Sequence, residues 1–402
     1  MRVLFVSDVY FPRVNGVSTS IRTFRQDLAN CDVETWLVAP RYDASPAAAR
    51  PAGDAGVPAD EAGVLRVPAS RVPGDPEDRR MAWRALRRTL DELPLPFDLV
   101  HIHTPFLAHY AGVRCARRAG VPCVATYHTF FEEYLHHYLP GLPRALSRFL
   151  ARSFTRSQCA AVQALIAPSE PMREVLTAYG VTTPIHVVPT GLAADRFRAG
   201  EAAAFRAREG IAPGRPLILY VGRVAHEKNI GFLVQMFTEV LRSVPEALLV
   251  IAGEGPARAS LRAQALAHGL AAQVHFAGYL ERNSALLDCY AAADVFVFAS
   301  RTETQGLVLL EAMAQGAPVV STAELGTRSV LLPASGALVV PEERTAFAAA
   351  VVRVLRDAGL RESMAARGRA YARSWSSAAM AARLARVYAE LRPPPRTVSI
   401  AA

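Results

Sequence analysis

The chain has 402 residues, of which 51% are hydrophobic and 20% charged, and this balance excludes a globally disordered protein. The length exceeds one typical domain core, so two domains are expected. The net charge of +9 favours anionic partners, namely nucleotide phosphates, nucleic acid or an acidic membrane. Five scattered cysteines without a C-x-x-C pair argue against a disulfide frame or a zinc site and for a reducing compartment.

Short apolar runs alternate with helical patterns through the first half. The apolar run that begins at Val3 is interpreted as a first strand rather than a signal peptide. It is followed directly by the acidic Asp8 and has no small-residue cleavage site. This βαβα order predicts a parallel sheet with helices on both faces. The strands expected here are Val3–Ser7, Val33–Ala39, Val64–Val67, Leu99–His103, Cys123–Tyr127, Ala164–Ala167 and Ile185–Val188. Residues 40–63, rich in alanine, proline and glycine, predict a surface loop.

A second alternating series begins near Pro216 and predicts a second parallel sheet. Its expected strands are Leu217–Val221, Leu248–Ala252, Val274–Phe276, Val295–Phe298, Val319–Ser321 and Ala337–Val339. Helices are expected at 343–356 and 359–372, and the segment from about 376 to 391 is amphipathic. The fold class is therefore α/β, with two doubly wound domains at 1–190 and 191–375. Ligands of such folds bind at the carboxyl ends of the strands, here expected to share one cleft.

The stretch Thr302–Ala314 gives the strongest chemical signal. It is expected to leave a buried strand and enter a helix, with Thr302 and Thr304 as candidate N-caps and Gly306 in the first turn. The backbone N–H groups of Gly306, Leu307 and Val308 then point out of a helix end, which carries about +0.5 charge and binds phosphate.

Two glutamates flank this helix end. Glu303 is expected in the loop before the helix, and Glu311 one to two turns inside it. A ligand with a central diphosphate and hydroxyl groups at both ends, such as a nucleotide sugar, fits this layout. The alternative is an ordinary βα unit with two surface glutamates.

Further candidate residues stand where other strands end. After Tyr220-Val221, Gly222 permits a sharp turn, and Arg223 and Lys228 are placed to meet a diphosphate. The alternative for this segment is a solvated basic loop.

The first domain offers weaker signals. Gly16 lies in the loop after the first strand, at a helix start where backbone can approach a phosphate. His128 ends another strand and is a candidate for the cleft. His101 and His103 end a neighbouring strand and are interpreted as mostly structural.

These motifs, in this order, resemble the retaining nucleotide-sugar glycosyltransferases of family GT4. Glu303 and Glu311 form that family's E-x7-E pattern. The loop Val6–Val17 is similar to its N-terminal phosphate loop, and Thr126–Thr129 and Gly222–Asn229 also match. The first loop and the run His128–Tyr134 look most like the branch that makes diacylglycerol glycolipids, with α-mannosyltransferases nearby. The resemblance covers nearly the whole chain.

The resemblance implies a GT-B fold, in which the last helix, here within 376–402, crosses back to the first domain. It implies that Glu311 binds the ribose hydroxyls and Glu303 the hydroxyls of the transferred hexose. Arg223 and Lys228 would neutralise the leaving diphosphate. Backbone at Gly306, Leu307 and Val308, with Gly16 across the cleft, would complete the cradle, and His128 would lie near the transferred sugar.

The implied mechanism uses no cofactor and no metal. The sequence has no Asp-x-Asp, and positive charge for the leaving group comes from Arg223, Lys228 and the helix end. Retention follows if the acceptor hydroxyl attacks from the side on which the diphosphate departs. Neither glutamate is then a covalent nucleophile, unlike the carboxylate pair of retaining glycosidases.

Two segments of the first domain combine arginines with bulky apolar residues, a pattern that suits an anionic membrane surface. The alternative is a solvated face over an ordinary core stripe, and no aromatic-basic motif favours nucleic acid. The first has Arg79, Arg80, Arg84, Arg87 and Arg88 beside Met81, Trp83, Leu86 and Leu90. The second has Arg144, Arg148, Arg152 and Arg156 beside Leu146, Phe149, Leu150 and Phe154.

The sequence thus predicts a cytoplasmic hexosyltransferase on the inner face of the cell membrane. Its expected reaction moves glucose from UDP-glucose to a lipid acceptor such as diacylglycerol. The first alternative is transfer of mannose from GDP-mannose to a glycolipid or a soluble glycan. Two alternatives of other classes are a nucleotide-sugar epimerase or phosphorylase on the same fold, and a non-catalytic basic binding protein.

Overall fold

The structure is a computed structural model that describes residues 1–42, 62–72, 75–93, 96–128, 144–282 and 284–392. The chain divides into two compact units. One comprises Met1–Thr190 with Ser377–Ala402, and the other comprises Gly191–Ser376. Most of the expected loop at 40–63, most of the run His128–Tyr134 and the C-terminal tail lie outside the described residues.

The first unit contains a parallel sheet of seven strands in the order β3-β2-β1-β6-β7-β8-β9. The strands are β1 (Arg2–Val6), β2 (Glu34–Pro40), β3 (Val64–Val67), β6 (Leu99–Ile102), β7 (Cys123–Thr126), β8 (Ala164–Ala167) and β9 (Ile185–Val187). The helices of this unit are α1 (Gly16–Leu28), α2 (Trp83–Asp91), α3 (Leu107–Ala119), α5 (Arg144–Cys159), α6 (Glu170–Ala178) and α15 (Ser377–Leu391). All seven expected strands of this unit are present within one or two residues of their expected bounds.

The side chains of β1 alternate between two apolar layers. Val3 and Phe5 pack in the layer that α1 and α15 cover, and Leu4 and Val6 pack in the layer that α2 and α3 cover. Successive side chains of a strand point to opposite faces, so an uninterrupted apolar run is what a sheet covered on both faces requires.

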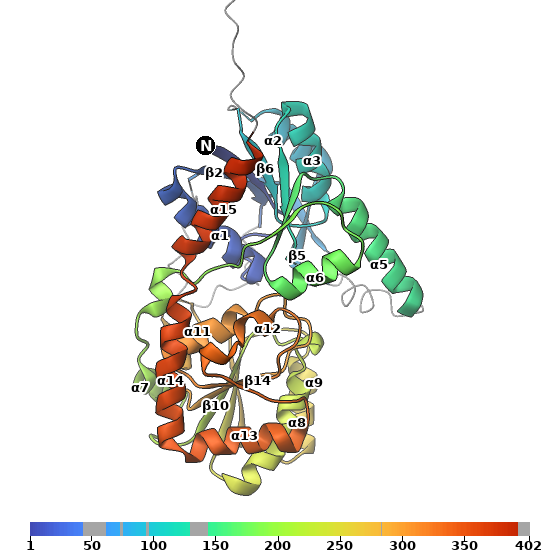
Figure 1. Ribbon diagram of the computed structural model, residues 1–402. Helices are drawn as coiled ribbons and strands as arrows, with labels where there is room; N and C mark the ends of the chain where they lie inside the picture. Colours follow the sequence, from blue (N-terminus) through green and yellow to red (C-terminus); the bar gives the residue numbers. More distant parts are fainter. Residues whose placement is uncertain (43–61, 73–74, 94–95, 129–143, 283, 393–402) are drawn as a thin grey trace, which may run out of the picture. The chain divides into compact units, whose positions relative to one another are not determined.

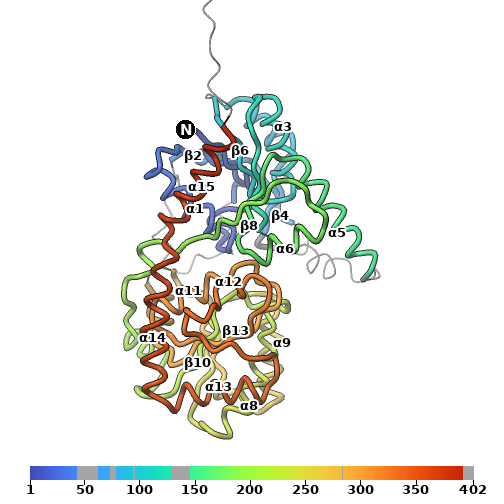
Figure 2. The backbone as a smooth tube through the Cα atoms, in the orientation of Figure 1, coloured from blue at the N-terminus to red at the C-terminus, as the bar shows by residue number. Residues whose placement is uncertain are grey.

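The last helix of the chain is part of the first unit. Helix α15 lies against α1, and the two run side by side in Figures 1 and 2. Its buried side chains Met380, Leu384, Val387 and Tyr388 join the apolar layer of Val3 and Phe5. The amphipathic period seen in the sequence thus serves to cover one face of the first sheet.

One hairpin was missed by the sequence analysis. Strands β4 (Ala69–Val72) and β5 (Asp75–Met81) pair antiparallel as a separate two-stranded sheet. Arg79 and Arg80 therefore lie on a strand, so the prediction that they belong to one amphipathic helix with Trp83–Leu90 is wrong. The run Asp75–Arg80 shows no apolar alternation, so no period of two residues marked it as a strand in the sequence.

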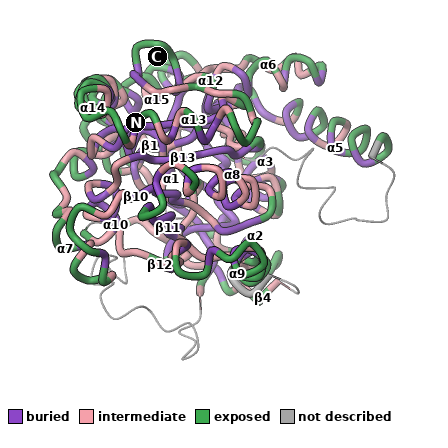
Figure 3. Tube along the Cα trace, turned by 90° about the horizontal axis from the view of Figure 1, so that it is seen from below, coloured by how far each residue is buried: buried purple, intermediate pink, exposed green. Residues whose placement is uncertain are grey.

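The second unit repeats the same plan with six parallel strands in the order β12-β11-β10-β13-β14-β15. The strands are β10 (Leu217–Val221), β11 (Leu248–Ala252), β12 (Val274–Gly278), β13 (Val295–Phe298), β14 (Val319–Ser321) and β15 (Leu338–Val339). The helices are α7 (Ala202–Arg208), α8 (Ile230–Ser243), α9 (Arg258–Ala267), α10 (Ala285–Ala291), α11 (Leu307–Gln315), α12 (Thr327–Val330), α13 (Arg344–Arg356) and α14 (Ala358–Arg373). The central strands are buried along their length (Figure 3).

Both strand orders are those of doubly wound folds, so the prediction of two Rossmann-like domains is confirmed. The order reverses between β1 and β6 in the first unit and between β10 and β13 in the second. Ligands of open α/β sheets bind outside the carboxyl ends of the strands at such switch points. The segments after β1, β6, β10 and β13 are therefore where functional side chains are to be sought.

Leu384→Ala is expected to lower the free energy of unfolding of the first unit by about 2–5 kcal/mol, the usual cost of a cavity in a packed core. Leu384 is fully buried, whereas Arg386 is exposed on the same helix. The matched control Arg386→Ala is expected to change that free energy by no more than about 0.5 kcal/mol. Urea denaturation read by hydrogen exchange of the β1 amides measures both. Equal effects of the two substitutions would contradict the packing of α15 on this unit.

Candidate functional site

Helix α11 begins differently from the sequence prediction. Gly306 is its N-cap, with φ of 95°, and no side chain caps the helix. The expectations that Thr302 or Thr304 caps it and that Gly306 lies in its first turn are therefore wrong. The left-handed conformation explains the glycine, because other residues reach it only with strain. Without a side-chain cap, the first N–H groups, at Leu307 and Val308, have no intrahelical partner and remain suited to an anion.

Glu311 lies in the second turn of α11 and only 4% of its surface is exposed. The Tyr290 hydroxyl donates a hydrogen bond to its Oε2 at 3.0 Å, and Arg282 forms an ion pair with its Oε1. Burial and the charge of Glu311 raise the pKa of Tyr290 well above its ordinary value, so the phenol keeps its proton. The carboxylate is thus held in one orientation by two side chains that the sequence analysis missed.

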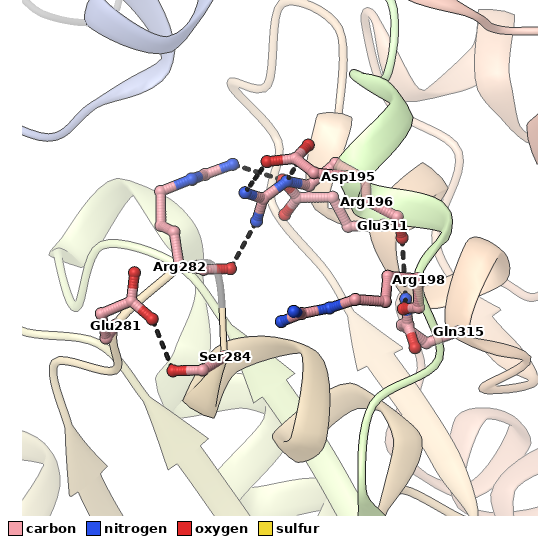
Figure 4. A network of polar contacts seen from close by, with 8 residues as sticks. All are labelled: Asp195, Arg196, Arg198, Glu281, Arg282, Ser284, Glu311 and Gln315. Atoms are coloured by element: carbon pink, nitrogen blue, oxygen red, sulfur yellow. Dashed lines mark hydrogen bonds and ion pairs between the residues drawn. The ribbon is translucent and has the colours of Figure 1, made fainter. Parts of the chain in front are cut away.

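Arg282 is itself anchored by its main chain. Its carbonyl oxygen accepts a hydrogen bond from Arg196 at 2.5 Å, and Arg196 is paired with Asp195. Gln315, at the end of α11, donates to the carbonyl oxygens of Arg196 and Arg198 at 2.7 and 2.8 Å. Figure 4 shows this network, which ties the segment before α7 to the middle of α11 at Glu311 and to its C-terminal end at Gln315.

Lys228 and Glu303 contact each other. The Lys228 Nζ lies 2.8 Å from Glu303 Oε2, and the two side chains are 15% and 25% exposed. Lys228 ends the short 3-10 helix His226–Lys228 after β10, and Glu303 lies in the loop after β13. Because β10 and β13 are neighbours at the switch point, their following loops meet, and the predicted cation and carboxylate meet with them.

A compositional signal could have singled out this lysine. Lys228 is the only lysine among the 45 lysine and arginine residues of the chain. Arginine is therefore this protein's default cation, and the exception falls where a compact ammonium contacts a carboxylate at a strand end. A guanidinium presents a wide planar fork, whereas an ammonium is a point charge with rotatable donors that can change partner.

Arg223 lies directly after Gly222, where β10 ends. Gly222 has φ of 153°, and a Cβ there would meet the Tyr220 hydroxyl at 2.8 Å. The loop after β11 presses against this turn, since a Cβ on Gly253 would lie 2.0 Å from the Gly222 carbonyl oxygen. The sequence analysis missed Gly253 and Gly255, although the Gly-Glu-Gly run after a strand was a usable signal.

In the first unit, Gly16 is the first residue of α1 and follows its N-cap, Asn15. The Asn15 carboxamide oxygen accepts a hydrogen bond from the Ser18 N–H at 2.8 Å. A Cβ added at Gly16 would meet nothing within 4 Å. The helix start is thus open on the side of Gly16, in agreement with its expected position.

His128 follows β7, is partly exposed, and contacts His103, one of a buried pair of histidines with His101. Its Nε2 lies 3.3 Å from the Nδ1 of His103, whose ring stands 4.1 Å from that of His101, centroid to centroid. His101 in turn bonds the Tyr388 hydroxyl of α15 at 2.6 Å. Burial lowers the pKa of His128 to about 4 and that of His101 to about 3. All three rings are therefore neutral at neutral pH.

The structure thus forms two groups of the predicted residues. The second unit holds Arg223, Lys228, Glu303, Glu311 and the start of α11 around the carboxyl ends of β10 and β13. The first unit holds Gly16 and His128. No helix in the described part of the chain is both long and apolar enough to cross a membrane. Within the same described ranges, no group of three or more histidine, cysteine and acidic side chains is arranged to hold a metal ion.

Comparisons with known proteins assign both units to glycosyltransferase families. Residues 14–196 match the family model described as Glycosyltransferase Family 4, and residues 201–371 match that described as Glycosyl transferases group 1. The alpha-monoglucosyldiacylglycerol synthase of Streptococcus pneumoniae is 32% identical over 336 residues, which cover 80% of this chain and 71% of that protein.

Two further proteins extend the match over nearly the whole chain. The GDP-mannose-dependent alpha-mannosyltransferase of Mycobacterium tuberculosis is 30% identical over 384 residues, covering 93% of each chain. Among solved structures, sucrose-phosphate synthase from Thermosynechococcus elongatus superposes with a TM-score of 0.77 at 21% identity, covering 97% of this chain and 98% of that one.

The buried histidines predict that the first unit loses stability as the pH falls from 7 to 5. Burial lowers the pKa of His109 and His128 to about 4 and that of His101 to about 3. Below the ordinary pKa of 6.5 the unfolded chain therefore binds protons that the folded chain excludes, at a cost of about 1 kcal/mol per pH unit for each histidine.

Asp8 stabilises the folded state as the pH falls, and it offsets the loss of stability that one histidine causes. Burial raises its pKa to about 6, so between pH 6 and its ordinary value the folded state binds the extra proton. The net effect remains a loss of stability, measurable as a falling midpoint of thermal unfolding. His109→Leu should make that fall shallower, because unfolding then takes up about one proton fewer below pH 6.5. A midpoint independent of pH between 7 and 5 would contradict the neutral buried cluster.

Proposed function

Because this chain belongs to glycosyltransferase family 4, we propose that it transfers a hexose from a nucleotide diphosphate sugar to a lipid acceptor, with retention at the anomeric carbon. Glucose from UDP-glucose and diacylglycerol are the proposed substrates. The observation that carries the proposal is the Lys228–Glu303 ion pair beside the uncapped start of α11. The similarity to the pneumococcal alpha-monoglucosyldiacylglycerol synthase supports the choice of sugar and acceptor.

Glu311 is suited to bind the ribose of the donor. A carboxylate has about four lone-pair positions, and Arg282 and Tyr290 engage one oxygen each. The remaining positions can accept hydrogen bonds from two neighbouring ribose hydroxyls. Because the carboxylate is already oriented, binding the ribose costs little further side-chain entropy.

Lys228 and Glu303 are suited to share the diphosphate and the hexose. A diphosphate carries more negative charge than a carboxylate, so it attracts the Lys228 ammonium when the donor binds. Glu303 then exchanges an ion pair for hydrogen bonds from hexose hydroxyls. The ion pair gives each group a partner of opposite charge.

The proposed chemistry places positive charge where the leaving group becomes more negative. Arg223, Lys228 and the N–H groups at the start of α11 supply that charge in a preorganised form. The acceptor hydroxyl attacks from the side on which the diphosphate departs, and a departing phosphate oxygen takes its proton. His128, kept neutral by burial that lowers its pKa to about 4, adds no charge to oppose the positive charge developing on the sugar.

Helix α5 is the proposed contact with the membrane. Its positions facing the core hold small or polar residues, Ser147, Ala151, Thr155 and Gln158. Its bulky residues are instead exposed: Leu146 by 45%, Phe149 by 61% and Leu150 by 43%. This is the reverse of an ordinary amphipathic helix. Arginines 148, 152 and 156 are also exposed on α5, which Figure 3 colours as exposed over much of its length. An anionic lipid surface can bind both kinds of side chain.

The other basic segment behaves differently. In α2, Leu86 and Leu90 are buried in the first unit's core, while Arg87 and Arg88 are exposed and Arg88 pairs with Glu92. For α2 the alternative interpretation therefore holds: its leucines pack in the core and its arginines face solvent. The proposed membrane contact rests on α5 alone.

Purified protein is expected to transfer glucose from UDP-glucose to diacylglycerol in anionic vesicles, with an α-linked product and no loss of rate in EDTA. Lys228→Arg and Glu303→Gln are each expected to lower kcat/KM by about 100-fold, as when one charge-stabilising group is removed. Glu362→Gln, an exposed glutamate on α14, is the matched control and should leave the rate unchanged.

The same assay separates the alternatives. Faster transfer from GDP-mannose would favour mannosyl transfer, which the 30% identity over 93% of both chains with the mycobacterial mannosyltransferase supports as second candidate. Donor turnover without acceptor would instead indicate an epimerase. Because Lys228 is the only lysine, slower acylation of its side chain in the presence of the nucleotide sugar reports donor binding directly. No protection by any nucleotide sugar would refute the proposed donor site.

Replacing Leu146, Phe149 and Leu150 together by serine is expected to abolish flotation of the protein with anionic vesicles, because the apolar contact with the lipid is lost. Leu266→Ser on α9 is the matched control, since Leu266 is exposed by 68% in the other unit, and it should float like the unchanged protein. If the triple variant also floats, α5 is not the membrane contact.

A further inference from the structure

His103 and His128 are joined at the carboxyl ends of two neighbouring strands. His103 directly follows β6, His128 lies two residues after β7, and these strands pair in parallel. The Nδ1 of His103 and the Nε2 of His128 are 3.3 Å apart, and the rings are inclined by 24°. One of these two nitrogens must carry the proton of the hydrogen bond.

The surroundings of His103 restrict its ring. It is 1% exposed, and the rings of Phe5 and His101 lie 4.5 and 4.1 Å away, centroid to centroid. His101 is fixed in turn by the Tyr388 hydroxyl and by Thr126, at 2.6 and 2.7 Å. Among the described residues, no hydrogen-bond partner reaches the buried Nε2 of His103.

This unpartnered nitrogen decides which ring donates. If His128 donated from Nε2, the neutral His103 ring would carry its own proton on Nε2, as a buried N–H without a partner. If His103 donates from Nδ1, its Nε2 is a lone pair instead. Buried N–H groups without partners are rarer in folded proteins than buried acceptors without partners, so the second arrangement is favoured.

We propose that His103 is a positioning residue that donates from Nδ1 to Nε2 of His128 and thereby fixes His128 as the Nδ1–H tautomer. His128 then acts as a hydrogen-bond donor through Nδ1, toward a hydroxyl oxygen of the transferred hexose. It does not act as a base, because its Nε2 lone pair is already engaged by His103. The part that concerns the hexose rests on the proposed function, whereas the tautomer does not.

In the proposed reaction, His128 orients the sugar and a different group accepts the proton of the acceptor hydroxyl. A neutral donor N–H orients the sugar without adding charge, and no imidazole competes for the proton of the acceptor hydroxyl. That proton passes to the departing phosphate oxygen, which gains the electron pair of the broken bond. His103 itself does not touch the substrate and acts only through His128.

Three substitutions of His103 test the geometry. Asparagine places its amide N–H close to the position of Nδ1, glutamine places it close to Nε2, and leucine has no donor. His103→Asn is expected to keep kcat, whereas His103→Gln and His103→Leu should lower it by about tenfold, the value of one hydrogen bond. KM for the nucleotide sugar should stay unchanged in all three. Equal loss in the asparagine and glutamine variants would overturn the proposal.

The tautomer itself is measured without substrate. Long-range ¹⁵N–¹H spectra of the ¹⁵N-histidine-labelled full chain at neutral pH distinguish Nδ1–H from Nε2–H, and His128→Asn assigns the signal. His128 is expected as Nδ1–H in the unchanged protein and in His103→Asn, and should lose that preference in His103→Gln. An Nε2–H signal from His128 in the unchanged protein would overturn the proposal. An Nδ1–H signal in a protein that transfers no hexose would refute the proposed function and leave the tautomer standing.

Discussion

The ion pair between Lys228 and Glu303 is the interaction on which the candidate site depends. It joins the loop after β10 to the loop after β13, the two neighbouring strands at which the order of the second sheet reverses. Glu303 lies in the loop that leads to α11, whose start has no side-chain cap and is therefore suited to an anion. A cation and a carboxylate that neutralise each other leave little unpaired charge at this strand end, and in the proposed function each takes a new partner from the donor.

The second carboxylate, Glu311, differs from Glu303 in its burial and in its partners. It is almost fully buried, and Arg282 and Tyr290 hold both of its oxygens. Arg282 is secured through Arg196 and Asp195, so the orientation is fixed by a network rather than by one contact. The Glu303 carboxylate is thus paired with a lysine and that of Glu311 with an arginine and a tyrosine, a difference that supports the proposed roles of Glu303 toward the hexose and of Glu311 toward the ribose.

In the first unit, desolvation keeps His128 neutral by lowering its pKa to about 4. His103 contacts His128, the ring of His101 packs on that of His103, and the Tyr388 hydroxyl bonds His101. The low pKa values of His128 and His101 follow from desolvation. Tyr388 belongs to α15, at the far end of the sequence. The last helix therefore covers the first sheet and also steadies the histidine cluster.

The sequence by itself determined the two α/β domains, the bounds of nearly every strand of both main sheets, and the strand ends at which candidate residues stand. These features can be predicted locally, because they depend on short sequence windows: apolar runs, the spacing of apolar residues, and glycines after strands. It missed the β4–β5 hairpin and the N-cap role of Gly306, because polar ribbons and left-handed caps leave weak local patterns. Only the tertiary structure decided that Lys228 meets Glu303, that Arg282 and Tyr290 hold Glu311, that His103 contacts His128, and that α5 exposes its bulky side chains. Each of these depends on strand order and helix packing between residues far apart in the chain, which no local period encodes.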